Sequence, residues 1–346
     1  MDQRPRSGFE PDGFAFFFAC LVPMSSAPAY EGRVLRSTGS WYEVQVPDAP
    51  DDVPAVVPSR IRGKFRLNEN DVTNPVAVGD RVTIQYNDDE ETGMIVEIHE
   101  RRNRLSRRAA GRRVQQEHVM VANIDRAWVV QAVQQPPLNT PFVDRFLVMA
   151  GVHNIPAGLV INKMDLADAE QKRQVEAVAE RYRSIDYPVY CTSATEEEGV
   201  AAWHEALRDQ VNVVTGPSGA GKSSLINAIA PELDIETKTI SKQTQKGRHT
   251  TTFAALHPLP EGGHIVDTPG VREFGILDMH PADLCHFFVE FVPYIDACKF
   301  DDCTHDHEPG CAVKEAVDEG AIHPERYDSY LSILYSLQDG MEGVGR

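Results

Sequence analysis

Several common features are missing from this sequence of 346 residues. No apolar run reaches the roughly 20 residues that a membrane-spanning helix needs, so we expect no membrane partner. No segment repeats, which argues against a repeat architecture. Basic residues are also few, because 34 lysines and arginines face 52 acidic residues and leave a net charge of −18. Composition alone therefore does not indicate a nucleic-acid-binding protein.

Glycine and lysine mark a phosphate-binding loop in the second half of the chain. Residues 216–223 read GPSGAGKS, which matches the pattern G-x-x-x-x-G-K-[ST] at every fixed position. The apolar run 211–215 before it predicts a buried strand, and Lys222 opens a predicted helix. A strand, a glycine-rich loop and a helix N-terminus together present backbone N–H groups to phosphates. We expect Lys222 to reach the β- and γ-phosphates and Ser223 to bind Mg²⁺.

Two later segments complete a predicted site for Mg²⁺ and the γ-phosphate. Residues 267–270 read DTPG, in which Asp267 can reach Mg²⁺ through water and the N–H of Gly270 can contact the γ-phosphate. Residues 247–252 read GRHTTT, where a threonine would bind Mg²⁺ and order its loop only with GTP. We favour Thr251 for this role and keep Thr250 as the alternative, against a threonine-rich surface loop with no such function.

A guanine-reading motif lies before the phosphate loop. Residues 162–165 read NKMD and follow an apolar run. Asp165 can accept hydrogen bonds from guanine N1–H and its exocyclic amine, which adenine does not offer, so discrimination against ATP can be large. The Lys163 stem can cover one face of the base, and the N–H of Ala194 can donate to guanine O6. This motif follows the phosphate loop in ordinary GTPases, so its position here indicates a circularly permuted domain.

The residue that positions the attacking water is less evident. Val271 follows the DTPG segment where many GTPases carry glutamine, so we expect slow intrinsic hydrolysis that depends on a partner. His249 is a candidate for this task, and a loop residue or RNA contact is its alternative role; Lys222 and Thr251 complete the predicted catalytic group. The predicted nucleotide site consists of Asn162, Lys163, Met164, Asp165, Ser193, Ala194, Gly216, Pro217, Ser218, Gly219, Ala220, Gly221, Lys222, Ser223, Ser224, Thr250, Thr251, Asp267 and Gly270.

Cysteine is scarce, with six in the chain, yet half of them lie in one short segment. That segment contains four potential metal ligands: Cys298, Cys303, His305 and Cys311. Three thiolates and one imidazole suit a structural Zn²⁺ site with no open position for catalysis. His307 is an alternative ligand; disulfides are a competing interpretation, but a protein that uses GTP works in a reducing cytosol. We expect Cys191 and Cys285 to pack as small apolar groups.

The first hundred residues contain short alternating segments and no helical period. Candidate strands occupy residues 32–36, 41–46, 61–67, 80–86 and 93–99, separated by glycine and proline. Five such strands suit a small barrel, for which an OB-fold is one option. Arg60, Arg62, Lys64 and Arg66 alternate with their neighbours, so all four cations are expected on one face. This face suits contact with RNA phosphates, and a solvated surface is the alternative.

An arginine-rich segment follows the predicted barrel. Residues 101–113 read RRNRLSRRAAGRR, which predicts a flexible linker or a nucleic-acid arm. The remaining residues carry a net charge of −25 once its seven arginines are set aside. Local basic patches that orient an acidic protein on RNA, or adaptation to a salty cytosol, would each account for this contrast.

These motifs together resemble the ribosome small subunit-dependent GTPase A family, circularly permuted bacterial GTPases that assist late maturation of the small ribosomal subunit. The matching segments are NKMD at 162–165, TSA at 192–194, GPSGAGKSS at 216–224, GRHTTT at 247–252, DTPG at 267–270, IRGK at 61–64, VGDRV at 78–82, ANIDRAWVV at 122–130 and the cysteine cluster at 298–311. The resemblance implies GTP hydrolysis stimulated by the small subunit, contact with its rRNA, and a hydrophobic residue such as Val271 in place of glutamine. An rRNA-binding scaffold that uses GTP as an affinity switch, with negligible turnover, is the alternative.

The expected fold is multidomain α/β. An OB-fold RNA-binding domain would span residues 30–100, a basic linker 101–114, the permuted GTPase domain 115–279 and a helical zinc-binding domain 280–346. In the last, Leu284, Phe287, Phe288 and Phe291 have helical spacing, and residues 327–337 give another helix. Residues 1–29 resemble a weak signal peptide, but we expect a disordered tail or a start at Met24. The expected state is a cytoplasmic monomer.

Overall fold

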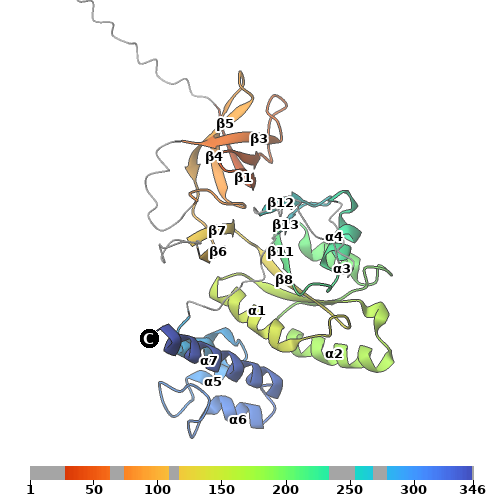
Figure 1. The fold of residues 1–346 in the computed structure, drawn as a ribbon, viewed down its shortest axis with the longest axis vertical. Helices are drawn as coiled ribbons and strands as arrows, with labels where there is room; N and C mark the ends of the chain where they lie inside the picture. The colour runs from red at the N-terminus through yellow and green to blue at the C-terminus, as the bar shows by residue number, and fades with distance from the viewer. Residues whose placement is uncertain (1–27, 63–73, 109–116, 234–253, 268–278, 345–346) are drawn as a thin grey trace, which may run out of the picture.

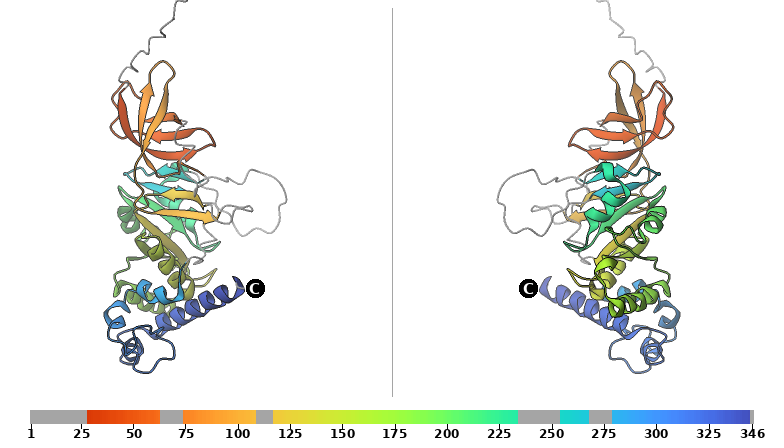
Figure 2. Two further views of the ribbon diagram at one scale, coloured as in Figure 1. Left: turned by 90° about the vertical axis from the view of Figure 1, so that its left-hand side faces the viewer. Right: turned by 90° about the vertical axis from the view of Figure 1, so that its right-hand side faces the viewer.

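The computed structural model describes residues 28–62, 74–108, 117–233, 254–267 and 279–344. A β-barrel, a sheet with helices on both faces and a helical C-terminal region follow one another along the long axis of the molecule (Figure 1 and Figure 2). Within the described ranges, no helix is both long and apolar enough to cross a bilayer. Some predicted residues lie outside these ranges, namely the tail 1–27, Lys64, Arg66, His249, Thr250, Thr251, Gly270 and Val271.

Five strands near the N-terminus close into a small barrel. They are β1 (Ala29–Ser37), β2 (Tyr42–Gln45), β3 (Val56–Ile61), β4 (Arg81–Asn87) and β5 (Thr92–Ile98). Neighbours pair in the order β1-β2-β3-β5-β4, and β4 pairs back onto β1. Residues alternate between buried and exposed positions, and inward side chains such as Val34, Val44 and Ile84 form the core. The predicted five-stranded barrel of the OB type is confirmed.

The third strand lies earlier than predicted. The prediction covered residues 61–67, of which 63–67 lie outside the described residues, whereas β3 begins at Val56 and ends at Ile61. Pro58 obscured this strand, because proline removes a ladder hydrogen bond and usually marks a break. In the structure Pro58 takes an exposed position, while the residues on either side of it point into the barrel.

Two of the four cations predicted on this strand are described. Arg60 is exposed on β3, and its guanidinium lies 3.9 Å from the ring centroid of Trp41. Arg62 is exposed just beyond the strand end. The stacking on Trp41 holds one cation on the outer face of the barrel.

A mostly parallel sheet forms the middle of the molecule. Its strands run in the order β10 (Val189–Cys191), β9 (Ala157–Asn162), β8 (Arg126–Ala132), β11 (Val211–Thr215), β13 (His264–Asp267) and β12 (Ala255–Pro258). The strand β12 is antiparallel to β13, and the other neighbours are parallel. Both β9 and β11 are buried at every position, which explains why they read as continuous apolar runs.

Helices cover both faces of this sheet (Figure 1). On one face, α1 (Thr140–Val152) and α2 (Ala169–Arg183) share a core with Val129. On the other, α3 (Val200–Leu207) and α4 (Lys222–Ile229) share a core with Trp128 and Val130. Short 3₁₀ helices, η2 (Met164–Leu166) and η3 (Pro231–Leu233), follow β9 and α4. Successive residues of β8 thus point to opposite cores, as the pleat requires.

The barrel and the parallel sheet join into one sheet of eleven strands. The junction is the antiparallel pairing of β1 with β12 through Arg36 and Ala255. Beside it, Nε2 of His264 on β13 lies 2.7 Å from Oε1 of Gln45 on β2. These two residues are 219 positions apart, so no local sequence pattern indicates the junction.

Part of the arginine-rich segment is folded. The strands β6 (Arg104–Arg108) and β7 (Glu117–Ala122) pair in a separate two-stranded sheet between the barrel and the parallel sheet (Figure 1). Arg101 forms an ion pair with buried Asp80 at 2.7 Å, and Arg102 forms one with Asp125 at 2.6 Å. These distant acidic partners fix the segment, so the expected flexibility is wrong for residues 101–108. Residues 109–114 lie outside the described chain.

The C-terminal region packs on the α1 face of the sheet. It consists of η5 (Pro281–Phe287), α5 (Val292–Ile295), α6 (Ala312–Asp318) and α7 (Pro324–Val344). Leu284, Phe288 and Phe291 are buried in the core that α1 and α2 share, as their spacing predicted. Phe287 is half-buried and lies against Gly151 of α1. The helical C-terminal region is thus confirmed, and it extends the core of the central domain.

A buried ion network fastens this region to the sheet helices. Arg326 at the start of α7 is 2% exposed; it donates to Asp144 of α1 at 2.7 Å and to Glu290 at 2.6 Å. The hydroxyl of Tyr182 on α2 donates to the same Asp144 carboxylate at 2.7 Å. One guanidinium therefore links α1, α7 and the segment between η5 and α5.

Candidate functional site

The glycine-rich segment 216–221 lies where β11 ends, at the carboxyl edge of the parallel sheet. Its glycines at 216, 219 and 221 have positive φ, and α4 begins at Lys222. A Cβ on Gly216 would lie 2.1 Å from the carbonyl oxygen of Val130, and one on Gly221 would lie 2.3 Å from Nδ2 of Asn162. Only glycine, which has no Cβ, leaves room for these close contacts. The loop thus brings the N-terminus of α4 to this edge, where an anion is favoured.

Lys222 folds back over this loop. Its Nζ donates to the carbonyl oxygens of Gly216 at 2.8 Å and Pro217 at 2.9 Å. The ammonium group therefore lies beside the N-terminus of α4. The positive charge of Lys222 and the positive end of the helix dipole lie on the same side of the loop. Ser223 is the second residue of α4 and is half-buried, and Ser224 is exposed.

The NKMD motif meets the phosphate loop through Asn162. This residue is buried at the end of β9, and its Nδ2 donates to the carbonyl oxygen of Ala220 at 3.0 Å. Its Oδ1 accepts from the hydroxyl of Thr192 at 3.2 Å. One amide thus joins three segments that are far apart in the sequence: the motif, the loop after β10 and the phosphate loop.

The Asp165 carboxylate is held in place by the loop after β10. The hydroxyl of Ser193 donates to Oδ1 of Asp165 at 2.7 Å, and the N–H of Glu196 donates to that same hydroxyl at 3.2 Å. Ser193 is fully buried, and Ala194 packs against the α3–α4 core. Lys163 has a left-handed backbone, and its Nζ donates to the carbonyl oxygen of Gln135 at 2.6 Å. The predicted base-reading residues therefore gather at one edge.

The predicted magnesium ligands are only partly described. Ser223 is present at the start of α4. Asp267 is the last residue of β13, which pairs in parallel with β11, so its backbone reaches the same edge of the sheet as the phosphate loop. Thr250, Thr251, Gly270 and His249 lie outside the described residues.

A second site lies in the C-terminal region, where four predicted ligands converge. The ligand atoms of Cys298, Cys303, His305 and Cys311 all lie within 4.8 Å of one another. Nδ1 of His305 is 3.5 Å from Sγ of Cys298 and 3.4 Å from Sγ of Cys311, and the two sulfurs are 4.0 Å apart. A tetrahedral zinc ion with bonds of about 2.3 Å to sulfur and about 2.0 Å to nitrogen gives ligand separations of about 3.5 to 3.8 Å.

The donor set therefore fits a four-coordinate metal ion. Burial raises the pKa of the Cys303 thiol to about 12, so a bound cation would be needed to hold it as a thiolate at neutral pH. His307 is 82% exposed and does not belong to the cluster, so its proposed substitute role is not supported.

Surrounding groups shape the metal loop. The carboxylate of Glu308 accepts from the N–H and hydroxyl of Thr304 at 2.9 and 2.7 Å, and from the N–H of Asp306 at 3.1 Å. Burial opposes its charge, but these hydrogen bonds prevail and lower the pKa of Glu308 to about 2. From α7, the hydroxyls of Tyr327 and Tyr330 donate to the carbonyl oxygens of His305 and Thr304, each at 2.7 Å.

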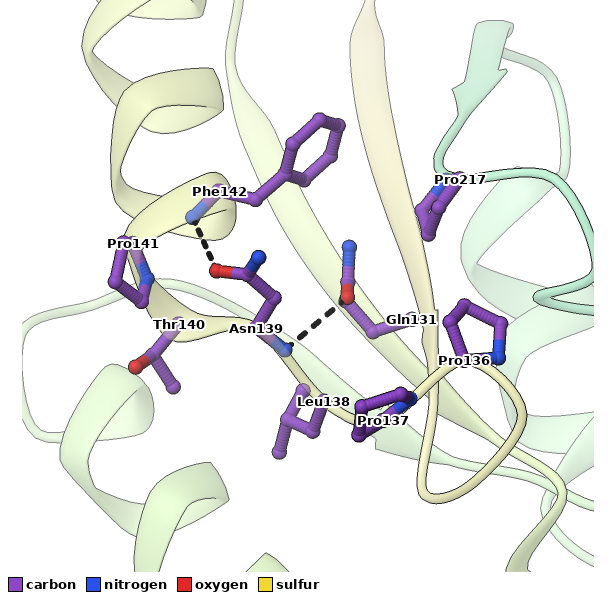
Figure 3. Close-up of a pocket in the computed structure, with 9 residues that line it drawn as sticks. All are labelled: Gln131, Pro136, Pro137, Leu138, Asn139, Thr140, Pro141, Phe142 and Pro217. Carbon is purple, nitrogen blue, oxygen red and sulfur yellow. Dashed lines mark hydrogen bonds between the residues drawn. The ribbon is translucent and has the colours of Figure 1, made fainter.

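Two residues near this carboxyl edge of the sheet were not among the predicted site residues. Gln135 contributes its backbone carbonyl to Lys163, and a backbone contact leaves no side-chain signal. Gln131 is fully buried near the end of β8, among apolar neighbours (Figure 3). A polar residue inside such a buried strand is a usable signal, because buried polar groups normally serve a hydrogen bond.

Comparison with known proteins agrees with this arrangement. Residues 98–277 match the family model described as RsgA GTPase, and residues 31–95 match that of the RsgA N-terminal domain. A protein named small ribosomal subunit biogenesis GTPase RsgA from Bacteroides fragilis is 42% identical over 310 residues, which cover 90% of this chain and 98% of the relative. Its namesake from Chlorobaculum parvum is 40% identical over 314 residues, with 89% and 98% covered.

Solved structures give the same result. The crystal structure of YjeQ from Thermotoga maritima has a TM-score of 0.75 and 34% identity, covering 92% of this chain and 100% of that chain. The crystal structure of YloQ, described as a circularly permuted GTPase, has a TM-score of 0.73 and 32% identity, with 90% and 96% covered. The order of motifs along the sequence, the fold and the relatives agree: this chain belongs to the RsgA GTPase family, and its GTPase domain is circularly permuted.

Proposed function

We propose that this chain is a GTPase that binds the small ribosomal subunit, assists its late maturation, and hydrolyses GTP to GDP and phosphate faster on the subunit. The observation that carries the nucleotide assignment is the 3.0 Å hydrogen bond from Asn162 to Ala220, which joins the guanine motif to the phosphate loop. It supports one ligand with a guanine at one end and phosphates at the other. The names of the curated relatives support the subunit as partner.

Each end of the nucleotide has its own proposed contacts. Asp165, oriented by Ser193, accepts from guanine N1–H and the amine, and the N–H of Ala194 donates to O6. Lys222 and the N-terminus of α4 stabilise the phosphates. The remaining proposed contacts are Asn162, Lys163, Met164, the loop residues 216–221, Ser224, Thr250 and Gly270.

Magnesium and the attacking water complete the proposed reaction. Ser223 and Thr251 bind Mg²⁺ directly, and Asp267 binds it through water. Val271 carries no group that can orient water, so hydrolysis by the free protein is slow. His249 is the proposed water-positioning residue, with Lys222 and Thr251 as the other catalytic residues.

The proposed metal of the C-terminal site is one structural Zn²⁺. Cys298, Cys303, His305 and Cys311 fill all four positions, and their separations suit zinc. When bound, the ion cross-links a loop that has little apolar core of its own. The loop is then rigid enough to present a defined surface to a partner.

The proposed RNA contacts lie on the barrel and on the arginine-rich segment that follows it. Arg60 and Arg62 are exposed on the barrel, and the arginines that follow Arg102 within residues 101–113 provide a second basic stretch. The proposed division is a barrel at 30–100, a basic connection at 101–114, a GTPase domain at 115–279 and a zinc domain at 280–346. We propose a cytoplasmic monomer that meets rRNA through these local patches.

A second candidate function follows from one residue. Because Val271 replaces the expected glutamine, the protein could serve as an rRNA-binding scaffold that uses GTP only as an affinity switch. Salt-sensitive RNA affinity would not separate the two functions, because both need it. Turnover on the subunit separates them.

The deciding experiment measures GTP hydrolysis by the purified protein, alone and with purified small subunits. Strong stimulation by the subunit, abolished in Lys222→Ala, is the result expected of a subunit-activated GTPase. Absence of stimulation, with GTP-dependent binding to the subunit intact, would favour the scaffold. Absence of any GTP-dependent binding would contradict both.

A further inference from the structure

Three side chains form a row across the outer face of the barrel, which lies at one end of the molecule (Figure 2). Trp41 comes directly before β2, Arg60 lies on β3 and Met94 lies on β5. The register of β3 and β5 places Arg60 beside Met94, and both are exposed, while their neighbours along each strand are buried. We call Trp41, Arg60 and Met94 the outer row.

The outer row contains a flat surface that is already assembled. The guanidinium of Arg60 lies 3.9 Å from the ring centroid of Trp41, which is partly exposed. The backbone of Trp41 is fixed by a turn, because its carbonyl oxygen accepts from the N–H of Thr38 at 2.9 Å and from the Thr38 hydroxyl at 3.3 Å. Met94 is 40% exposed and adds a polarizable thioether beside Arg60. A planar ring can therefore stack here without rearrangement of the backbone.

The charge of this face favours an anionic partner. Arg60 and Arg62 are both exposed, and Arg62 directly follows the end of β3. The strands β2 and β3 contain one acidic residue, Glu43, and its carboxylate is paired with Arg36 at 3.6 Å. The face thus has a local excess of cations on a chain whose net charge is −18.

We propose that the outer row binds an unpaired base of single-stranded RNA. The base stacks on the exposed surface of the Trp41–Arg60 pair, Met94 contacts the base, and Arg62 attracts a neighbouring phosphate. Every base has a planar face, so this site selects unpaired nucleotides without selecting a sequence. The inference rests on the proposed function for RNA as the partner, and it adds the class of RNA and the side chains that hold the base.

Tryptophan fluorescence reports on the outer row selectively. The chain has three tryptophans, and Trp128 and Trp203 are fully buried, so a ligand on the surface can quench only Trp41 by contact. The full chain is titrated with hexauridylate in the presence of Mg²⁺ and saturating GDP, which fills the nucleotide site. Hexauridylate should quench part of the emission to saturation. A heparin hexasaccharide, which is highly charged but has no planar base, should not.

Variants separate stacking from general attraction, with affinities measured by anisotropy of fluorescein-labelled hexauridylate. Trp41→Leu removes the ring and should weaken binding by about tenfold, a usual loss for one base–aromatic stack. Trp41→Phe keeps a ring and should retain most of the affinity. Met94→Ala should weaken binding by a smaller factor.

Val56→Ala is the matched control for Met94→Ala. Val56 is 41% exposed and lies on the same outer face of β3, but it is four residues from Arg60, a separation of about 13 Å along a strand. This change should leave the affinity for hexauridylate unaltered.

Four results would each overturn the proposal: no saturable quenching by hexauridylate, equal quenching by heparin, unchanged affinity in Met94→Ala, or equal quenching by a tyrosine-capped hexaglutamate peptide, which would assign the face to a protein partner. Because Met94 is on the surface, its variant decides even if Trp41→Leu does not fold. Stimulation of GTP hydrolysis by the small subunit is measured in parallel. Stimulation without quenching would overturn the outer row as a base site and leave the proposed function standing, and quenching without stimulation would do the reverse.

Discussion

In the proposed function, recognition of the base depends on Asp165. Its carboxylate is an acceptor only, and Ser193 holds it at 2.7 Å. In Asp165→Asn, an amide donor would face the two donors of guanine, so we expect GDP affinity to fall about 10- to 100-fold. Xanthosine diphosphate offers a carbonyl there and should bind the variant better than GDP does. Calorimetric titration with both nucleotides measures this reversal.

Ser193→Ala is the control for that change. It keeps the carboxylate and removes only the hydrogen bond that orients it, so GDP affinity should fall less and the preference for guanine should remain. If Asp165→Asn still prefers GDP to xanthosine diphosphate, Asp165 does not read the base.

We expect the stability of the fold to depend on pH through His264. Burial, with a smaller effect of nearby Arg33, lowers the pKa of His264 from 6.5 to about 4. The unfolded chain therefore takes up a proton near pH 6.5, whereas the folded chain does so only near pH 4. We expect the free energy of unfolding contributed by this residue to be full above pH 6.5 and to fall as pH drops toward 4.

Urea unfolding of the native protein and His264→Gln across this window measures that contribution. The variant should lose less stability than the native protein as the solution becomes acidic. Equal losses would mean that His264 is not kept neutral at the contact with Gln45.

The sequence predicted best those site residues that belong to short sequence motifs. Asn162, Asp165 and Lys222 belong to recognisable sequence motifs, and the structure brings these motifs to one edge of the sheet. Gln131 and Gln135 belong to no motif. Their contacts depend on where the segment after β8 lies in three dimensions, which the sequence does not state.

At the scale of elements, the metal loop and α7 stabilise each other. Two tyrosine hydroxyls of α7 donate to carbonyl oxygens of the loop, so the loop conformation and helix docking are linked. Cys303→Ser should remove the proposed zinc ion and lower the melting temperature by about 5 °C or more. Metal analysis and thermal unfolding measure both effects.

Cys191→Ser is the matched control, because Cys191 is half-buried and lies outside the cluster. It should keep its metal and change the melting temperature less. A Cys303→Ser protein that retains one zinc ion and the native melting temperature would contradict the four-ligand assignment.

Elements with regular patterns were predicted and irregular ones were not. The buried strands β9 and β11 were predicted clearly, because burial on both faces favours apolar residues at most of their positions. The strand β3 was misplaced because Pro58 interrupts its pattern while taking an exposed position. The pairing of β6 with β7 was missed because arginine runs usually remain solvated. Here Arg101 and Arg102, which precede β6, form ion pairs with Asp80 and Asp125.

At the scale of the whole molecule, Arg326 connects the C-terminal region to the GTPase domain. Arg326→Ala would leave the carboxylates of Asp144 and Glu290 buried without their cation. We expect a loss of about 3–5 kcal/mol in the free energy of unfolding, the usual result of breaking a buried ion pair from one side. Urea unfolding measures the loss.

Arg173→Ala provides the comparison, because Arg173 pairs with Glu170 on the exposed surface of α2. That change should cost less than about 0.5 kcal/mol. A similar cost for both variants would show that the buried network contributes no more than a surface ion pair. No periodic pattern indicates this network, because its members come from positions 144, 182, 290 and 326.

The eleven-stranded sheet also has a consequence for how the protein is made. On a translating ribosome the barrel strands emerge first, yet the outer side of β1 near Arg36 receives its partner only when Ala255 has left the exit tunnel. Until then the nascent barrel presents an open strand edge, a surface on which other chains can pair. The covering of this edge is thus timed by the synthesis of the GTPase domain, and a stalled or truncated chain would carry the edge uncovered.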